Sequence, residues 1–357
     1  MSHAYPRLTP KATVAEAAHL LRTKGWLPIP LVDAEGRPGA ALSPHDVVRA
    51  VAERRDLNRT TVDEVAATDL PTIGPDASFD EANAAMARSG YMVVLVVEGS
   101  QLAGALTLPD MQGHQLAEDV LGPAAANVTT EISPNDLMHS GSWGAYAYAG
   151  VTAVQTIREV LHTHGRPDPA SILDLPCGHG RELRFLKLAY PDARMGVCDI
   201  DADGVDFCAR TFGADPIVSN DNPAAVSFDQ RYELAWSGSL FTHLSAERWQ
   251  GFLEMYARAL EPGGLLLFSA NGYLPPSILR DLGLNADQAE QLLDDFRTDH
   301  FGFVSTGQGK WGLSLARPLW VKEQIDRSPL ELLSYEKRAW KPPSPAQDVV
   351  VCTLPAS

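Results

Sequence analysis

The turn 175–180, read L-P-C-G-H-G, brings together residues that could seat a small polar molecule. The apolar run 172–175 precedes it and the amphipathic segment 181–189 follows it, so the pattern predicts a strand, a tight turn and a helix. Gly178 and Gly180 allow backbone N–H groups to approach a ligand at the start of that helix. We therefore expect this turn to bind a polar ligand through backbone donors.

Two carboxylates lie at the first two expected strands of this region. Asp174 is within the strand 172–175, and Asp199 lies 25 residues further on, after the expected strand 195–198, where an acid can hold ribose hydroxyls. A nicotinamide-binding G-x-G-x-x-G motif uses the same arrangement, but Leu183 stands in place of its third glycine. A dinucleotide site is therefore the weaker interpretation.

Histidine and cysteine add further candidates. His243, in S-L-F-T-H-L-S, follows a strand and could act as a general base near neutral pH. The alternative is that it caps or packs the start of the next helix. Cys177 has no base placed near it by sequence, so a structural role is expected. His162 and His164 suit the end of a helix, and no metal site is predicted.

Strands and helices alternate through the C-terminal part, which predicts a mostly parallel sheet with right-handed crossovers. Ligands then bind at the carboxyl ends of the strands, where the turn and Asp199 both lie. Extra helices are expected over 275–303, followed by a loop over 306–312. The expected strands are 172–175, 195–198, 216–218, 232–236, 265–269, 330–335 and 348–353.

The N-terminal part is an internal repeat. T-V-A-E-A from Thr13 recurs as S-F-D-E-A from Ser78, and A-L-S-P-H-D from Ala41 recurs as A-L-T-L-P-D from Ala105. Each copy is expected to form a helix, a strand, a turn, a strand and a helix. One copy cannot bury its helices and its sheet alone, so the two copies are expected to pack together.

The overall charge and composition of the chain exclude further classes of function. The 357 residues carry a formal net charge of -16 without a basic block, which argues against binding to nucleic acid or to an anionic membrane. No apolar run is long enough for a bilayer, and the first ten residues lack a signal-peptide pattern, so a cytoplasmic location is expected. The four cysteines show no C-x-x-C spacing and are expected to be reduced.

Residues 8–122 resemble a tandem pair of cystathionine-β-synthase-type (CBS) motifs. The resemblance implies that Ser43 with Asp46, and Thr107 with Asp110, face an adenosyl ligand such as AMP, ATP or S-adenosylmethionine, each Asp accepting from ribose hydroxyls. The alternative is that each pair is only a helix N-cap with an acid at the third position. Such pairs usually dimerise, so a homodimer through this region is expected.

After the segment 123–139, expected to be a linker, residues 140–357 resemble the class I S-adenosylmethionine-dependent methyltransferases. The motifs that carry the resemblance are L-D-L-P-C-G-H-G, D-I-D and L-E-P-G-G-L-L-L-F-S. The resemblance implies an α/β fold class, with a Rossmann-like, seven-stranded, mostly parallel sheet whose last two strands form an antiparallel hairpin. Pro176 replaces the usual first glycine of the turn, as in a subgroup with D-x-P-C-G-x-G.

The family pattern implies a role for each strand end. The methionine moiety is assigned to Asp174 and the turn, the ribose to Asp199 with Ile200 beside it, adenine to Asn220 or Asp221, and the methyl side to Ser237 and Gly238. The turn residues concerned are Pro176, Cys177, Gly178 and Gly180.

These resemblances imply a methyltransferase that acts on an unidentified small-molecule or sugar acceptor and is regulated by an adenosyl ligand at the CBS pair. Methyl transfer is an in-line displacement, so the site must align the acceptor and exclude water. The insertion 275–303 is expected to cover the acceptor. Two alternatives stay open: a non-catalytic sensor or scaffold that keeps the methyltransferase fold, and an NAD-dependent oxidoreductase.

Overall fold

The computed structural model describes residues 5–23, 28–67, 69–139, 143–307, 311–342 and 345–356. Contacts divide the chain into two compact units, Met1–Leu116 with Leu137–Tyr148, and Ala117–Asp136 with Ala149–Ser357. The domain limits expected from the sequence stay a prediction, and their boundary at residue 140 lies outside the described residues. Two helices, α4 (Leu108–Leu121) and α5 (Trp143–Thr163), pass from one unit into the other.

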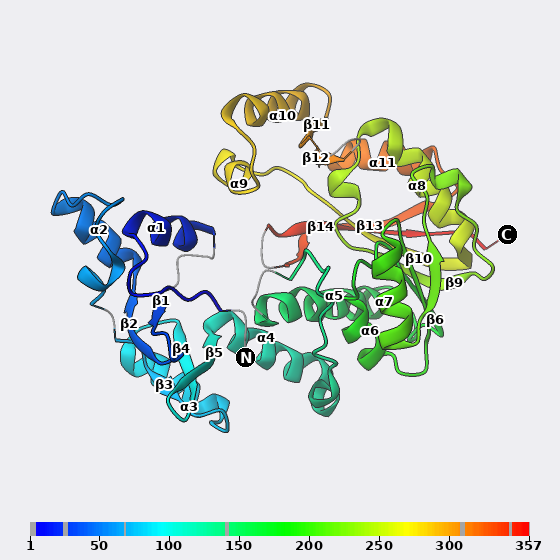
Figure 1. The fold of residues 1–357 in the computed structure, drawn as a ribbon. Coiled ribbons are helices and arrows are strands. Elements are labelled where there is room, and N and C mark those ends of the chain that lie inside the picture. Colours follow the sequence, from blue (N-terminus) through cyan, green and yellow to red (C-terminus); the bar gives the residue numbers. More distant parts are fainter. Residues whose placement is uncertain are drawn as a thin grey trace. The chain divides into compact units, whose positions relative to one another are not determined.

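The first unit contains the predicted repeat, one helix–strand–strand–helix copy after another (Figure 1). The two strands within each copy pair antiparallel, and the short β3 (Thr72–Ile73) adds a parallel strand to the second copy. The first copy is α1 (Val14–Thr23), β1 (Ile29–Val32), β2 (Pro38–Leu42) and α2 (Pro44–Ala52); the second is α3 (Phe79–Ser89), β4 (Val93–Glu98), β5 (Gln101–Thr107) and α4.

Polar caps explain where the helices of this unit begin. Ser43 and Ser78 each accept a hydrogen bond from a backbone N–H three residues later, and the acids Asp46 and Glu81 bond back to the cap residue. Gly90, with φ of 74°, ends α3 in the left-handed conformation that favours glycine. The short apolar faces of each copy pack into small cores, such as Val14, Ala17 and Leu21 against Ile29 and Leu42.

The second unit is built on a seven-stranded sheet in the order β13-β14-β10-β9-β6-β7-β8. All neighbours pair parallel except β14, which runs antiparallel to both β10 and β13. The predicted mostly parallel sheet with a terminal hairpin is confirmed. Its strands are β6 (Ser171–Asp174), β7 (Arg194–Asp199), β8 (Asp215–Val218), β9 (Tyr232–Ser237), β10 (Leu260–Ala270), β13 (Glu331–Trp340) and β14 (Gln347–Thr353).

One helix precedes the first strand of this sheet, and the others lie between successive strands along the chain (Figure 1). The helices are α5, α6 (Leu183–Ala189), α7 (Ala202–Phe212), α8 (Ala246–Ala259), α9 (Pro276–Asp281), α10 (Ala286–Thr298) and α11 (Pro318–Asp326). Among the residues described, none of the helices has the length and apolar character that crossing a bilayer requires.

The insertion after β10 differs from the sequence expectation at its end. The helices α9 and α10 are present, but Phe301–Ser305 forms β11, which pairs antiparallel with β12 (Gly312–Ala316). Local helical spacing could not indicate this hairpin, because its strands are held by pairing and by burial against α10. Part of the expected 306–312 loop, residues 308–310, lies outside the described residues.

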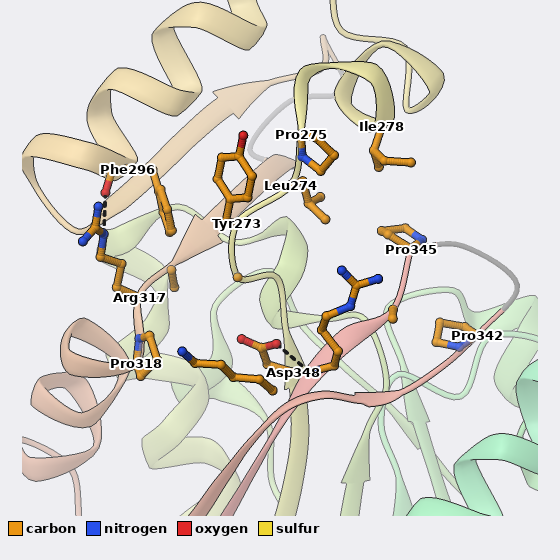
Figure 2. Close-up of a pocket in the computed structure, with 15 residues that line it drawn as sticks. Tyr273, Leu274, Pro275, Ile278, Phe296, Arg317, Pro318, Pro342, Pro345 and Asp348 are labelled. Carbon is orange, nitrogen blue, oxygen red and sulfur yellow. Dashed lines mark hydrogen bonds between the residues drawn. The ribbon is translucent and has the colours of Figure 1, made fainter.

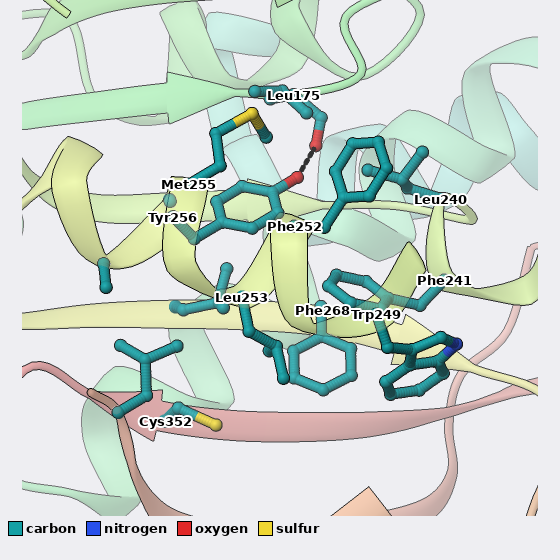
Figure 3. Packing of buried hydrophobic residues seen from close by; sticks show 14 of the residues in the cluster. Leu175, Leu240, Phe241, Trp249, Phe252, Leu253, Met255, Tyr256, Phe268 and Cys352 are labelled. Carbon is teal, nitrogen blue, oxygen red and sulfur yellow. Dashed lines mark hydrogen bonds between the residues drawn. The ribbon is translucent and has the colours of Figure 1, made fainter. Parts of the chain in front are cut away.

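The core of the second unit is formed by α8 against the sheet (Figure 3). The Phe241 ring lies 4.3 Å from that of Phe268 and 4.7 Å from that of Trp249, measured between centroids. Tyr256 reaches from α8 across the sheet, and its hydroxyl donates a 2.6 Å hydrogen bond to the Leu175 carbonyl oxygen. The aromatic core therefore holds the carboxyl end of β6 in place.

Candidate functional site

The turn after β6 is shaped by two glycines in the left-handed conformation. Gly178 has φ of 47° and Gly180 has φ of 78°, values at which a side chain causes strain. A Cβ at Gly178 would meet nothing within 4 Å, whereas one at Gly180 would lie 2.5 Å from the Phe212 ring. Gly178 therefore leaves open space above the turn, and Gly180 allows α7 to pack closely.

Helix α7 supports the turn from below. A Cβ on Gly204 would lie 2.4 Å from the Gly178 carbonyl oxygen, so only glycine permits this approach. The buried His179 ring places Nε2 3.0 Å from Asp203 Oδ2 on the same helix. Sequence reasoning missed both contacts, although Gly204 stands close after the D-I-D motif and could have signalled a close approach.

Asp174 is the most unusual group at this site. Its side chain is 1% exposed, and neither carboxylate oxygen has a hydrogen-bond partner within the described structure. Burial, and then the negative charge of Glu182, raises the pKa of Asp174 well above its ordinary value. A buried carboxylate without a partner is unfavourable, so a ligand that brings a cation or N–H donors to it fits this position.

Asp199 meets the turn at the end of β7, as the sequence predicted. Its Oδ2 accepts from the Gly178 N–H at 2.8 Å, and its Oδ1 accepts from the Asp201 N–H at 2.9 Å. Burial raises the pKa of Asp199, and these N–H groups act in the opposite direction. A carboxylate offers about four acceptor positions, so capacity remains for ligand hydroxyls. The side chain of the next residue, Ile200, is 49% exposed.

Asn220 and Asp221 lie in the turn after β8, next to Asp199. The Ser219 N–H donates to the Asp199 carbonyl oxygen at 2.7 Å, which joins the two strand ends. Asn220 Oδ1 accepts from the Asn222 N–H, and Asp221 Oδ1 pairs with the Arg248 guanidinium at 3.0 Å. Both residues therefore lie near Asp199 at the same edge of the sheet. Their role toward adenine stays a prediction.

Ser237 and Gly238 end β9, two strands from β7. The Ser237 side chain is fully buried, and its Oγ lies 2.7 Å from the Tyr256 hydroxyl. Because the tyrosine proton goes to the Leu175 carbonyl, Ser237 donates to Tyr256. The Ser237 hydroxyl thus faces the core, and only its backbone and Gly238 can line a ligand.

Ser239, which the sequence analysis did not single out, holds an uncommon conformation at this edge. Its φ is 62°, its N–H donates to Ser269 Oγ at 2.7 Å, and its Oγ accepts from Gln347 Nε2 at 2.9 Å. These contacts join the ends of β9, β10 and β14. A strained residue held by several hydrogen bonds is typical of functional sites.

His243 ends a short 3-10 turn after β9 and is exposed. Its Nδ1 lies 2.7 Å from the Gly312 carbonyl oxygen. Because a carbonyl only accepts, Nδ1 carries the proton, and Nε2 of the neutral ring keeps its lone pair. The ring can therefore accept a proton at Nε2, and its hydrogen bond also joins the start of β12 to the 3-10 turn that follows β9.

A cavity of about 820 Å³ opens at the carboxyl end of β10 (Figure 2). The segment after β10 supplies Tyr273 and Leu274 to its wall, and α10 of the insertion supplies Phe296; that the insertion covers an acceptor stays a prediction. The hairpin β13–β14 adds Arg338 and Asp348, which the sequence analysis did not identify. His243 is not among the residues that line this cavity.

The CBS positions form the N-caps that the sequence left as an alternative. Asp46 Oδ2 accepts from both the N–H and the hydroxyl of Ser43 at 2.8 Å, and Oδ1 pairs with Arg49 at 2.7 Å. In the second copy, Asp110 Oδ2 likewise accepts from the N–H of Thr107 at 2.8 Å and from its hydroxyl at 2.7 Å. Capping therefore accounts for both pairs, and their role toward an adenosyl ligand stays a prediction.

The second copy adds one contact of its own. Asp110 Oδ1 accepts the Gly144 N–H at 2.7 Å, and a Cβ on Gly144 would lie 2.0 Å from the Asp110 Cα. The first turn of α5 thus packs backbone to backbone against the start of α4.

Comparisons with known proteins support both halves of the sequence interpretation. Residues 172–264 match the family model of a methyltransferase domain, and residues 62–114 match that of the CBS domain. The chain therefore carries a methyltransferase domain and a CBS domain, as the two resemblances implied.

Similar proteins were found for each half. The CBS domain-containing protein YhcV of Bacillus subtilis is 29% identical over 123 residues, 34% of this chain and 86% of that protein. A CBS domain protein from Pyrobaculum aerophilum complexed with AMP is 27% identical, with a TM-score of 0.28 over 30% of this chain and 83% of that one. An S-adenosylmethionine-dependent methyltransferase from Clostridium acetobutylicum is 13% identical, with a TM-score of 0.39 over 57% of this chain and 91% of that one.

Proposed function

We propose that this chain is an S-adenosylmethionine-dependent methyltransferase that acts on a small-molecule acceptor. The observation that carries the proposal is the buried carboxylate of Asp174, which has no hydrogen-bond partner within the described structure and lies at the end of β6, directly before the turn with Gly178. S-adenosylmethionine carries an ammonium and a sulfonium, and a cation beside a buried carboxylate offsets the cost of its burial. The pyrophosphate of NAD would instead bring negative charge toward Asp174, Asp199 and Glu182, which disfavours the oxidoreductase alternative.

The residues of the chain have separate tasks in this proposal. Asp174 and the backbone of residues 176–180 hold the methionine end, Asp199 accepts from the ribose hydroxyls, and Asn220 or Asp221 approaches adenine. When bound, the cofactor supplies a methyl group activated by the sulfonium. The protein must align the acceptor with that methyl group and exclude water from the site.

Asp174→Asn is expected to weaken binding of S-adenosylmethionine by about tenfold, because a charge-assisted contact becomes a neutral one. The same change is expected to raise the free energy of unfolding at pH 7. A raised pKa means that the folded state binds more protons than the unfolded one, so stability falls as pH rises through the window above the ordinary value of 3.8. Asparagine does not titrate, so the variant does not lose this stability as the pH rises.

Calorimetric titration and urea denaturation at pH 5 and pH 8 measure the two effects of Asp174→Asn. A variant that binds the cofactor as tightly as the wild-type chain would contradict the role given to Asp174.

The catalytic role predicted for His243 is that of a general base for a hydroxyl acceptor, and it requires the acceptor hydroxyl to extend from the cavity beside β10, whose described lining does not include His243, as far as His243 Nε2. Asparagine can keep the donor to the Gly312 carbonyl while removing the Nε2 lone pair, so His243→Asn separates the base role from the structural role. The base role predicts that kcat falls about 100-fold, with the melting temperature unchanged. An unchanged kcat would leave His243 as a residue that only holds β12.

Regulation through the CBS pair is the second part of the proposal. A ribose hydroxyl bound at Asp110 Oδ1 would compete with the Gly144 N–H, which belongs to the first turn of α5. Helix α5 continues into the second unit, so a ligand that displaces its first turn has a covalent route to the methyltransferase domain. The homodimer through the CBS pair and the cytoplasmic location stay predictions.

A further inference from the structure

We infer that the cavity beside β10 binds an acceptor that combines an apolar body with a carboxylate or phosphate group. The role of this ligand as a methyl acceptor rests on the proposed methyltransferase function. Its binding to the cavity does not. The charge of the cavity wall, the availability of its cations and the position of the cavity along the sheet edge all favour such a ligand.

The wall is cationic in a strongly acidic chain. Arg317, Lys337 and Arg338 line the cavity, and Asp348 is the one carboxylate among its described lining residues. Both oxygens of Asp348 are engaged, Oδ2 by the Tyr335 hydroxyl at 2.7 Å and Oδ1 by the Arg338 backbone N–H at 2.8 Å. With a formal net charge of -16 over the whole chain, this concentration of cations favours an anionic ligand.

The cationic groups are available to a ligand. Arg317 donates from Nε to the Phe296 carbonyl oxygen at 3.2 Å, and its guanidinium carbon lies 5.1 Å from the centroid of the Phe296 ring. Within the described part of the chain, its terminal nitrogens and the side chains of Lys337 and Arg338 form no ion pair. A guanidinium presents paired donors that match the oxygens of a carboxylate or a phosphate.

The opposite side of the cavity is apolar. Figure 2 shows Tyr273, Leu274 and Pro275 facing the cavity across from Asp348, with Phe296 beside Tyr273. Tyr273 is 59% exposed, although a large aromatic side chain gains from being covered. A volume of about 820 Å³ is within the range of small-molecule sites. The wall therefore suits an organic anion better than a free inorganic ion.

The position of the cavity fits an acceptor. Asp348 pairs with Ala270 at the carboxyl end of β10, and Gln347 bonds to Ser239 at the end of β9. The cofactor turn follows β6, the next strand beyond β9. Two strand spacings of about 4.8 Å separate β10 from β6, so the near edge of the cavity lies on the order of 10 Å along the sheet edge from the turn, and Lys337 and Arg338 on β13 lie two strands further away.

The test uses benzoate, phenyl phosphate and the neutral benzamide as probes, titrated into the full-length chain without cofactor. Benzoate or phenyl phosphate is expected to bind, at least about tenfold more tightly than benzamide, with affinity that falls as salt is added. Comparing the two anions tells which group the site prefers. Benzamide binding as tightly as both anions, or no binding of either anion, would overturn the inference.

The variant Lys337→Gln, Arg338→Gln is expected to lower the affinity for the preferred anion at least about tenfold. The matched control Arg280→Gln, Arg297→Gln removes two positive charges from the insertion helices α9 and α10, at residues that do not line the cavity, and is expected to leave affinity unchanged. Equal affinity in the cavity variant and in the wild type would also overturn the inference. Titration of S-adenosylmethionine into the same samples tests the proposed function separately, because anion binding and cofactor binding can fail independently.

Discussion

Asp199→Ala is expected to lower the affinity for S-adenosylmethionine by about 100-fold or more. Hydrogen bonds to a charged group are each worth about 1.5–3 kcal/mol, and Asp199 is proposed to accept from the ribose hydroxyls. The change also removes the acceptor of the Gly178 N–H, which holds the open turn at the end of β7. Both losses act on the same ligand, so binding is expected to fall far more than stability.

Calorimetric titration of the cofactor into each variant measures this effect. Asp201→Ala is the matched control, because Asp201 stands two residues away, is exposed and caps α7 rather than holding the turn. The control keeps the backbone N–H that donates to Asp199, so its cofactor affinity is expected to stay within about threefold of the wild type. Equal loss in both variants would show that the effect comes from the D-I-D turn as a whole.

Arg184→Met is expected to destabilise the second unit by about 3 kcal/mol or more. The Arg184 guanidinium is 1% exposed and donates to the carbonyl oxygens of Gly180, Thr129 and Glu131 at 2.7–2.9 Å. Methionine keeps an apolar stem of similar length but leaves these buried acceptors without their donor. The change therefore loosens both the cofactor turn and the segment before α5.

Urea denaturation followed by tryptophan fluorescence measures the loss of stability in Arg184→Met. Arg210→Met is the control, because Arg210 is exposed on α7 and forms a surface ion pair with Asp206. Surface ion pairs of that kind contribute little, so the control is expected to unfold at nearly the wild-type urea concentration. A loss below about 1 kcal/mol in Arg184→Met would show that water replaces the guanidinium at these carbonyls.

The sequence predicted the parts of the site that are local in the chain. Gly178, Gly180 and Asp174 lie within one strand and turn, and the distance to Asp199 follows from one helix and one strand. Such spacings reflect the geometry of the strand–helix–strand unit, so they are visible without tertiary contacts.

The parts that the sequence did not reveal depend on contacts between distant segments. Arg184 binds carbonyls of residues 129 and 131, within the segment expected to be a linker, and an arginine in a helix gives no sign of such partners. The cationic wall combines Arg317, which directly precedes α11, with Lys337 and Arg338 of β13, which are separated from it in the sequence and line the same cavity in the fold. Pairing of β11 with β12 is likewise a non-local feature.

The most direct test of the proposed cofactor site is calorimetric titration of the full-length chain with S-adenosylmethionine, S-adenosylhomocysteine, NAD, AMP and ATP. The site predicts that S-adenosylmethionine binds the wild type and the Asp46→Asn, Asp110→Asn variant alike, and is lost in Asp199→Ala. AMP or ATP binding that disappears only in the Asp46→Asn, Asp110→Asn variant would support the proposed adenosyl-ligand site in the CBS pair. Saturation by NAD without binding of either S-adenosyl compound would contradict the central claim.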